Sequence, residues 1–166
     1  MKTLYLMRHA KSSWKDRALA DHERPLNKRG KKAAPEMGRR LKKKGVRLDA
    51  IVSSDARRAL DTAVAVAEIL GLSPQAVRQM NDLYHATPDR ILDIVYRLNE
   101  KWNQVMVVGH NPGMTELVQR FYPEPIANLP TAGIVELRFD VSYWQRIDSD
   151  TLAFSAVDYP KNKSPR

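Results

Sequence analysis

Runs of hydrophobic residues long enough to form buried strands recur along the whole chain. The clearest lie at 2–7 and 105–108, and each contains four successive apolar positions. Continuous apolar runs of this length, bounded by polar residues, are typical of strands that are buried on both faces. Weaker runs predict further strands at 49–52, 74–80, 134–139 and 152–156.

Between the strands, apolar residues recur every three or four positions, which is the period of an amphipathic helix. The first such stretch follows Asn27, a suitable N-cap residue, and ends near Gly45, a residue type that commonly terminates helices. Three more helices are predicted at 59–70, from 88 to about 98, and from 113 to about 121. Each of the first four predicted strands is therefore followed by a helix.

The order of these elements predicts the fold class. Helices that alternate with strands are typical of α/β proteins, and the last two strands have no helix between them, so we expect a mixed sheet. The prediction is α/β: a three-layer α/β/α sandwich with a mostly parallel, mixed sheet of five or six strands. With 166 residues, 43% of them hydrophobic, the chain suits a single domain at 1–160. The charged, proline-containing stretch 161–166 is expected to be a disordered tail.

Composition excludes several classes of protein. No apolar stretch approaches the roughly 18 residues of a membrane span, and Arg8 interrupts the first apolar run too early for a secretory signal. We therefore expect a cytoplasmic protein with no membrane partner. The chain contains no cysteine, which excludes disulfides, thiolate chemistry and cysteine-bound zinc.

The net charge of +9 lies in one stretch of the chain. Residues 28–47 contain ten Lys or Arg and one Glu, and the remaining residues balance at eighteen basic and eighteen acidic. Such a stretch is most simply a solvated helix face, or else a surface that docks an acidic protein such as a phosphorylated signalling domain. Nucleic-acid binding is less favoured, because no aromatic residues are interleaved with the lysines to stack on bases.

Histidine and arginine residues follow three of the predicted strands. Arg8 and His9 end the first strand, Arg57 and Arg58 follow the second, and His110 follows the fourth. The carboxyl ends of neighbouring parallel strands lie at one edge of a sheet, where α/β folds bind their ligands. These side chains are therefore expected to form one pocket.

Two guanidinium groups and two imidazoles suit a phosphoryl group. Guanidinium groups match pairs of phosphoryl oxygens, and a neutral imidazole attacks phosphorus well when an acceptor fixes its other nitrogen. We predict that His9 is the nucleophile and that the second imidazole binds the phosphoryl group, with the polar loop at 11–23 as part of the pocket. A zinc site on His9 and His110 is a weaker alternative, because neither a third ligand nor HExxH spacing is evident.

Three segments resemble the signatures of a known family. They are 6–9 (LMRH), 54–62 (SDARRALDT) and 107–112 (VVGHNP). Together they resemble the histidine phosphatase superfamily, also called phosphoglycerate mutase-like, over residues 2 to about 140. The short chain, the segment 8–14 (RHAKSSW) and the segment 24–26 (RPL) with Gly30 resemble its SixA-type phosphohistidine phosphatase branch in particular. The resemblance implies a phosphoglycerate mutase-like fold.

The resemblance also implies a role for each residue of the predicted pocket. His9 would become phosphorylated, and Arg8, Arg58 and His110 would bind the phosphoryl group. The family pattern is Arg-Ala-x-x-Thr, and this pattern begins at Arg58 rather than at Arg57. Arg57 is therefore expected at the surface or the rim.

Four further residues are candidates for the edge of the pocket. Arg24, Ser12 and Asn111 are expected to contact the substrate, and Asp82 is the candidate general acid, with His85 close by. Family members that act on phosphate monoesters use a carboxylate after the third strand to protonate the leaving alkoxide. The pattern around Asp82 departs from that of the family. A phosphohistidine substrate would need no strong acid, because imidazole is the better leaving group.

On this resemblance, the predicted function is a metal-independent phosphatase without a cofactor that forms a covalent phosphohistidine intermediate. Its expected substrate is a phosphohistidine protein, such as a histidine-containing phosphotransfer domain in signal transduction. Two alternatives stay open. One is a phosphomonoesterase of the same superfamily that acts on a small phosphorylated metabolite, and the other is a non-catalytic protein that binds anions or nucleic acid through 28–47.

Overall fold

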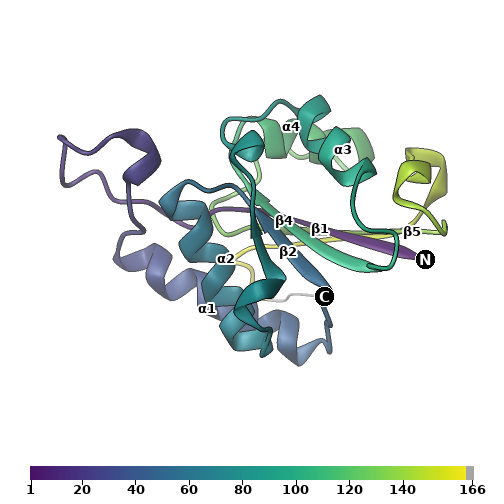
Figure 1. Cartoon of the computed structure of the whole chain (residues 1–166), viewed down its shortest axis with the longest axis horizontal. Helices are drawn as coiled ribbons and strands as arrows, with labels where there is room; N and C mark the ends of the chain where they lie inside the picture. The colour runs from purple at the N-terminus through teal and green to yellow at the C-terminus, as the bar shows by residue number, and fades with distance from the viewer. Residues whose placement is uncertain (164–166) are drawn as a thin grey trace.

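A computed structural model of the chain describes residues 1–163, in which six strands form one sheet (Figure 1). The strands are β1 Lys2–Arg8, β2 Ala50–Ser53, β3 Val77–Gln79, β4 Gln104–Gly109, β5 Ile134–Phe139 and β6 Leu152–Asp158. Their order in the sheet is β3-β2-β4-β1-β5-β6. The α-helices are α1 Lys28–Lys43, α2 Arg57–Leu70, α3 Pro88–Tyr96 and α4 Gly113–Phe121.

β1 lies in the middle of the sheet, between β4 and β5. It pairs in parallel with β4, and β4 pairs in parallel with β2, so these three strands end at the same edge. β5 runs antiparallel to both β1 and β6, which makes the sheet mixed. The register places Arg8 opposite Gly109 and Ser53 opposite Val108. The segments that follow β1, β2 and β4 therefore leave the sheet side by side.

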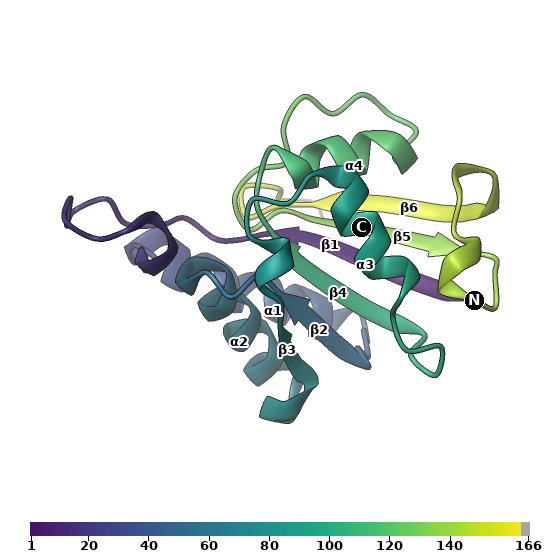
Figure 2. The same ribbon diagram turned by 45° about the horizontal axis from the view of Figure 1, so that its top comes forward.

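Helices cover both faces of the sheet: α1 and α2 lie on one face, and α3 and α4 lie on the other (Figure 2). Successive side chains of a strand point to opposite faces, so β1 contributes to both layers. Leu4 and Leu6 belong to the same hydrophobic core as Leu117 of α4, whereas Tyr5 and Met7 belong to the core beneath α1 and α2. Two cores thus hold the central strand from both sides.

The predicted α/β sandwich with a mixed sheet is confirmed, and the four helices lie close to the predicted ranges. Asn27 caps α1, because its side-chain oxygen accepts a hydrogen bond from the backbone N–H of Gly30 at 2.8 Å. The long loop between β1 and α1 projects beyond the edge of the sheet, as the dark purple segment at the left of Figure 1. This loop carries one 3-10 turn, Asp21–Glu23.

Two predicted strands have an end that differs from its predicted position by two residues or more. The strand predicted at 74–80 is shorter, because Pro74–Ala76 forms a 3-10 turn and only Val77–Gln79 pairs with β2. Proline has a fixed φ and no backbone N–H, which suits the first position of such a turn. The strand predicted at 152–156 is longer, since β6 continues to Asp158.

The segment after β6 lies along α1. Arg40 of α1 donates hydrogen bonds to the carbonyl oxygens of Tyr159 and Pro160, both at 3.0 Å. The expected domain limits, 1–160 with a disordered tail at 161–166, stay a prediction, and residues 164–166 lie outside the described part. Within residues 1–163, no helix has the length and apolar character needed to cross a membrane.

Candidate active site

The two histidines predicted to share a pocket lie next to each other. His9 directly follows β1 and His110 directly follows β4, and the parallel pairing of these strands brings the ring centroids to 5.1 Å. Both residues are buried, with exposed fractions of 8% for His9 and 3% for His110. The sheet therefore creates the central contact of the site.

The backbone fixes the tautomer of the His9 ring. Its Nδ1 lies 2.7 Å from the carbonyl oxygen of Ala10. A carbonyl oxygen only accepts, so Nδ1 carries the hydrogen and Nε2 keeps a free lone pair in the neutral ring. Burial lowers the pKa of His9 to about 4, with smaller contributions from the Arg58 and Arg8 charges and opposition from the Ala10 hydrogen bond. His9 is therefore neutral and nucleophilic near neutral pH.

His110 has one bound nitrogen and one buried nitrogen without a partner. Its Nε2 lies 2.8 Å from Ser54 Oγ, and that oxygen accepts a hydrogen bond from the backbone N–H of Ala56. The hydroxyl hydrogen is then available to Nε2, which leaves an N–H on Nδ1, and Nδ1 has no partner within residues 1–163. Burial lowers the pKa of His110 to about 3, and the charge of Arg58 acts in the same direction. The neutral ring can donate this N–H to a phosphoryl oxygen.

The two arginines at the start of α2 have different environments. Arg57 is exposed and pairs with Asp61 one helical turn away, at 3.7 Å. Arg58 is 5% exposed, and its charge lowers the pKa of both His9 and His110. The structure thus brings Arg58 to the histidines and leaves Arg57 at the surface.

Thr62 connects α2 to the segment after β1. Its hydroxyl donates to the carbonyl oxygen of Arg58 at 2.7 Å and accepts from the backbone N–H of Ala10 at 3.0 Å. Thr62 is fully buried, so these bonds are shielded from water. The spacing Arg-Ala-x-x-Thr therefore joins the helix turn that carries Arg58 to the residue that follows His9.

Arg8 is bound through one nitrogen and has another nitrogen unpaired. Its Nη1 donates to the carbonyl oxygen of Leu129 at 3.0 Å, while its buried Nε has no partner within the described chain. The Asn111 side chain donates to the same carbonyl oxygen at 3.2 Å and accepts from the backbone N–H of Thr115 at 3.1 Å. Asn111, a predicted substrate-binding residue, therefore holds the carbonyl that positions Arg8. Burial lowers the pKa of Arg8, but a guanidinium stays charged at neutral pH.

A further set of side chains converges on Asp21 in the loop after β1. Asp21 Oδ2 accepts hydrogen bonds from Arg58 Nη2 at 2.9 Å and from the Tyr84 hydroxyl at 2.5 Å, and it lies 3.3 Å from His85 Nε2. Burial acts to raise the pKa of Asp21, but the hydrogen bonds from Tyr84 and Arg58 outweigh this and lower it to about 2. Asp21 is therefore an ionised anchor and not a proton donor near neutral pH.

His85 lies beside the pocket in an uncommon backbone conformation. Its φ is 53°, in the left-handed region that costs a residue with a Cβ about 1 kcal/mol. Its ring centroid lies 5.5 Å from that of His110 and 4.0 Å from that of Tyr84. Gly113 at the start of α4 permits this packing, because a Cβ there would lie 2.0 Å from the carbonyl oxygen of Ala86.

The sequence points to some of the residues around Asp21 and not to others. The polar loop at 11–23 is expected to join the site, and Asp21 comes from it. His85 stands out only as the histidine near Asp82, and no pattern marks Tyr84. Asp82 itself is exposed and forms no hydrogen bond or ion pair with any residue of 1–163. The role of Asp82 as the general acid therefore stays a prediction.

Arg24 and Ser12, the other predicted substrate-binding residues, shape the loop that carries Asp21. The buried Arg24 donates to the carbonyl oxygens of Asp16 at 2.9 Å and Leu19 at 3.0 Å. Its guanidinium also lies 3.9 Å from the centroid of the Trp14 ring. Ser12 forms an isolated backbone bridge to the segment before α1. These contacts hold the loop.

No group of three or more His, Cys, Asp or Glu side chains within residues 1–163 is placed to hold a metal ion.

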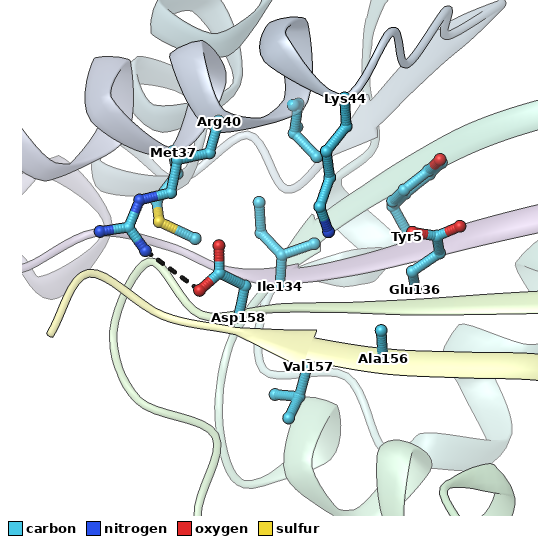
Figure 3. Close-up of a pocket in the computed structure, with 10 residues that line it drawn as sticks. Tyr5, Met37, Arg40, Lys44, Ile134, Glu136, Ala156, Val157 and Asp158 are labelled. Carbon is cyan, nitrogen blue, oxygen red and sulfur yellow. Dashed lines mark hydrogen bonds and ion pairs between the residues drawn. The ribbon is translucent and has the colours of Figure 1, made fainter. Parts of the chain in front are cut away.

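A small cavity lies away from the histidines, between α1 and the strands β5 and β6 (Figure 3). Its lining includes Arg40, Lys44 and Asp158 but none of the residues around His9. The cavity in Figure 3 is therefore separate from the candidate active site at the strand ends.

A family model described as the histidine phosphatase superfamily (branch 1) matches residues 4–87. The match contains the segments around His9 and Arg58 and ends before His110. It also contains Asp21, Tyr84 and the long loop after β1.

Proteins similar over most of the chain include Rv1276c, an uncharacterized protein of Mycobacterium tuberculosis. It is 30% identical over 165 residues, which cover 93% of this chain and 100% of that protein. A solved structure from Nakamurella multipartitia that carries the name phosphohistidine phosphatase SixA is 26% identical, with a TM-score of 0.82 over 97% of both chains. A structure of the same name from Agrobacterium tumefaciens is 28% identical, with a TM-score of 0.76 over 84% of this chain and 92% of the other.

Proposed function

This chain belongs to the histidine phosphatase superfamily, and from that premise we propose that it is a phosphohistidine phosphatase of the SixA type. In the proposed reaction, a phosphoryl group passes from a histidine of the substrate protein to His9 and then to water. The proposal needs no metal and no cofactor. Arg8, Arg58 and His110 supply the positive charge and the hydrogen-bond donors that phosphoryl oxygens require.

The state of His9 is the observation that carries this proposal. The Ala10 carbonyl holds Nδ1 at 2.7 Å, and a pKa of about 4 keeps Nε2 unprotonated near neutral pH. Two buried donors close to it, Arg8 Nε and His110 Nδ1, have no partner within residues 1–163. A phosphoryl group bound by these donors would face an imidazole that is ready to attack.

In the first step, the lone pair of His9 Nε2 forms a bond to phosphorus while the P–N bond of the substrate breaks. The electron pair of that bond returns to the substrate imidazole, which is protonated on its other nitrogen and so departs as a neutral ring. His9 becomes a phosphorylated imidazolium, and the carbonyl oxygen of Ala10 continues to accept from its Nδ1. No additional proton donor is needed.

In the second step, the oxygen of a water molecule forms a bond to phosphorus, and the bond from phosphorus to His9 Nε2 breaks. The electron pair of this bond returns to Nε2, and both hydrogens of the water leave on the product, dihydrogen phosphate. Arg8, Arg58 and His110 stabilise the charge on the phosphoryl oxygens in both transition states. His9 is restored as a neutral ring.

The choice of a phosphohistidine substrate follows from the acids of the pocket. An alkoxide leaving group needs a proton from a general acid. Asp21 is ionised at neutral pH because its pKa is about 2, and the Asp82 side chain forms no hydrogen bond or ion pair within residues 1–163 that would hold it in the pocket. Imidazole leaves without such help. We therefore propose a phosphohistidine protein as substrate, such as a histidine-containing phosphotransfer domain of a cytoplasmic signalling pathway.

Hydrolysis of a chemically phosphorylated histidine peptide in the presence of EDTA tests the proposal. We expect the purified protein to release inorganic phosphate and the His9→Ala variant to release none above background. Arg57→Ala is the matched control, because Arg57 is exposed and pairs with Asp61 on the surface of α2. Absence of hydrolysis by the unmodified protein, or undiminished hydrolysis by His9→Ala, would refute the proposal.

The position of His85 favours a second candidate, hydrolysis of small phosphate monoesters. Its Nε2 lies 3.3 Å from Asp21 Oδ2, and its ring lies beside that of His110. An imidazole oriented by a carboxylate is a common general acid, so a protonated His85 could pass the hydrogen on Nδ1 to a departing alkoxide. The relative kcat/KM for a phosphohistidine peptide and an alkyl phosphate decides between the two candidates.

A further inference from the structure

The positive charge of the chain is concentrated on the exposed side of α1. The helix packs its small and apolar residues on the sheet and exposes its basic residues. Glu36 pairs with Arg39 and Arg40, at 3.1 and 3.5 Å, in the second half of the helix. The first half, before Glu36, contains four basic residues, Arg29 among them, and no acidic one. The charge is therefore least neutralised near the start of α1.

The segment after β6 adds further positive charge beside this helix. Arg40 pairs with Asp158 at 3.0 Å, the contact drawn as a dashed line in Figure 3, and also binds the carbonyl oxygens of Tyr159 and Pro160. These bonds fix the segment along α1. Lys161, which follows directly, is therefore held near the same surface.

A groove of about 370 Å³ lies between α1, the segment after β1 and the segment after β6. Its lining includes three basic residues, Lys11, Arg29 and Lys161, and no acidic residue. Alanine and proline residues form apolar parts of its wall. We call this feature the basic groove.

The basic groove opens next to the pocket. Lys11 lies two residues after His9 in the chain. Gly30 allows α1 to approach this segment, because a Cβ on Gly30 would lie 2.2 Å from the carbonyl oxygen of Lys11. Pro130, which also lines the groove, directly follows the residue whose carbonyl oxygen binds Arg8 at 3.0 Å. A chain that lies in the groove would therefore reach the histidines within a few residues.

The other side of the pocket carries negative charge. Asp21 binds Arg58, and Asp55, which follows β2, pairs with His22 at 2.8 Å. These residues lie on the β2 side of the pocket, whereas the basic groove lies on the β5 and β6 side, with β4 and β1 between them. A large substrate therefore meets opposite charges on the two sides, and this favours one orientation.

We propose that the basic groove docks an acidic segment of the phosphorylated protein while the phosphohistidine of that protein occupies the pocket at His9. The inference rests on the proposed function and adds the chemistry of the partner. The three cations have no acidic residue beside them in the lining that the described residues form, so they attract carboxylates, and the alanine and proline walls suit the aliphatic parts of the side chains that carry those carboxylates. An acidic protein fits better than nucleic acid, because a polyanion that spans the pocket would also meet Asp21 and Asp55.

The experiment uses two synthetic phosphohistidine peptides that differ only in their flanking residues, which are Glu in one and Gln in the other. At low ionic strength we expect kcat/KM to be about tenfold higher for the Glu peptide, because electrostatic attraction raises the rate of encounter. At about 0.5 M salt the two values should converge, since charges at the surface are then screened.

Charge-reversal variants test whether the preference for the Glu peptide arises in the basic groove. Arg29→Glu and Lys161→Glu should each abolish the preference for the Glu peptide and change kcat/KM for the Gln peptide by less than about twofold. Lys101→Glu is the matched control, because Lys101 is exposed and lies before the amino end of β4, at the opposite edge of the sheet from His110. This variant should keep the preference.

The outcomes separate the docking inference from the proposed function. Equal hydrolysis of both peptides by the unmodified protein would overturn docking and leave the function intact, whereas hydrolysis of neither would overturn both. An equal loss on both peptides in Arg29→Glu would also overturn docking, because the groove would then only support the pocket. Stronger inhibition by oligo(dT) than by the unphosphorylated Glu peptide would identify a nucleic-acid surface and contradict an acidic protein partner.

Discussion

The floor of the pocket and its rim are built in different ways. The floor follows the ends of β1, β2 and β4 and consists of Arg8, His9, Arg58 and His110. The rim comes from two loops and consists of Asp21, Tyr84 and His85. Sheet pairing holds the floor, because His9 and His110 follow paired strands, whereas the rim converges on a single carboxylate oxygen.

This difference indicates that the floor and the rim have different roles in the reaction. The floor histidines are almost fully buried and their pKa values are strongly lowered, which suits a reaction common to every substrate. The rim side chains are partly open to solvent, with 38% of Asp21 and 57% of His85 exposed. We expect changes in the floor to affect all substrates alike and changes in the rim to depend on the leaving group.

The largest effect should come from removal of the nucleophile. His9→Ala should lower kcat by about 10⁴-fold on phosphohistidine peptides and aryl phosphates alike, because no other floor residue accepts the phosphoryl group. Phosphate release measures the rate, and circular dichroism confirms that the variant is folded. A loss confined to one class of substrate would contradict the division between floor and rim.

Removal of one floor cation should have the next largest effect. Arg58→Ala should lower kcat by about 10² to 10³-fold on both classes of substrate, because it removes charge that stabilises the transition state. Arg57→Ala, one residue away and exposed, should change kcat by less than about twofold. Equal losses in the two variants would mean that the sequence pattern had selected the wrong arginine.

The effect of a rim variant on kcat should depend on the leaving group of the substrate. His85→Gln should lower kcat on alkyl phosphates by about 10²-fold, because an alkoxide needs a proton donor, and should change kcat on phosphohistidine peptides by less than about threefold. Asp93→Asn, on α3 and paired with Arg97 at the surface, is the control and should leave both rates unchanged. Equal losses on the two substrates in His85→Gln would show that His85 supports the pocket as a whole.

The smallest expected effect is on the pH dependence of the free energy of unfolding. The folded-state pKa values of His9 and His110, about 4 and 3, lie below the ordinary value of 6.5, so the unfolded chain binds protons first as pH falls. The contribution of the two neutral histidines to the free energy of unfolding is therefore fully present above about pH 6.5. It decreases as the pH falls toward the folded-state pKa values of about 4 and 3. Asp21 acts only at lower pH, since its pKa is lowered from 3.8 to about 2.

His110→Gln should therefore reduce the acid sensitivity of folding. Between about pH 7 and pH 5, the free energy of unfolding should fall by about 2 kcal/mol less in this variant than in the unmodified protein, because one of the two shifted histidines is absent. Urea unfolding at the two pH values measures the difference. An unchanged or steeper dependence would show that His110 is not held in its neutral form.

The floor could be predicted from the sequence, and the reason is physical. The apolar runs that form β1 and β4 are continuous, and the residues that follow them must leave the sheet at the same edge once the strands pair in parallel. His9 and His110 were therefore marked by their position next to the strands. Arg58 could be separated from Arg57 only through the family pattern, and the structure adds its reason in the hydrogen bonds of Thr62.

The rim could not be predicted in the same way, because loops have no period that fixes the direction of their side chains. The sequence marked His85 only as a neighbour of the candidate acid Asp82, whereas in the structure the His85 ring lies beside Asp21 and His110. The packing around His85 includes the approach of Gly113 to the carbonyl oxygen of Ala86. Such a contact between distant segments has no signal in a single sequence.

The most direct test of the account is to isolate the phosphorylated enzyme during turnover. The protein is mixed with radiolabelled phosphoramidate, quenched in alkali and digested, and the labelled peptide is identified by mass spectrometry. We predict a label that is stable in alkali and lost in acid, located on His9 and absent from His9→Ala. A label on another residue, or an unlabelled protein during steady release of phosphate, would contradict the central role of His9.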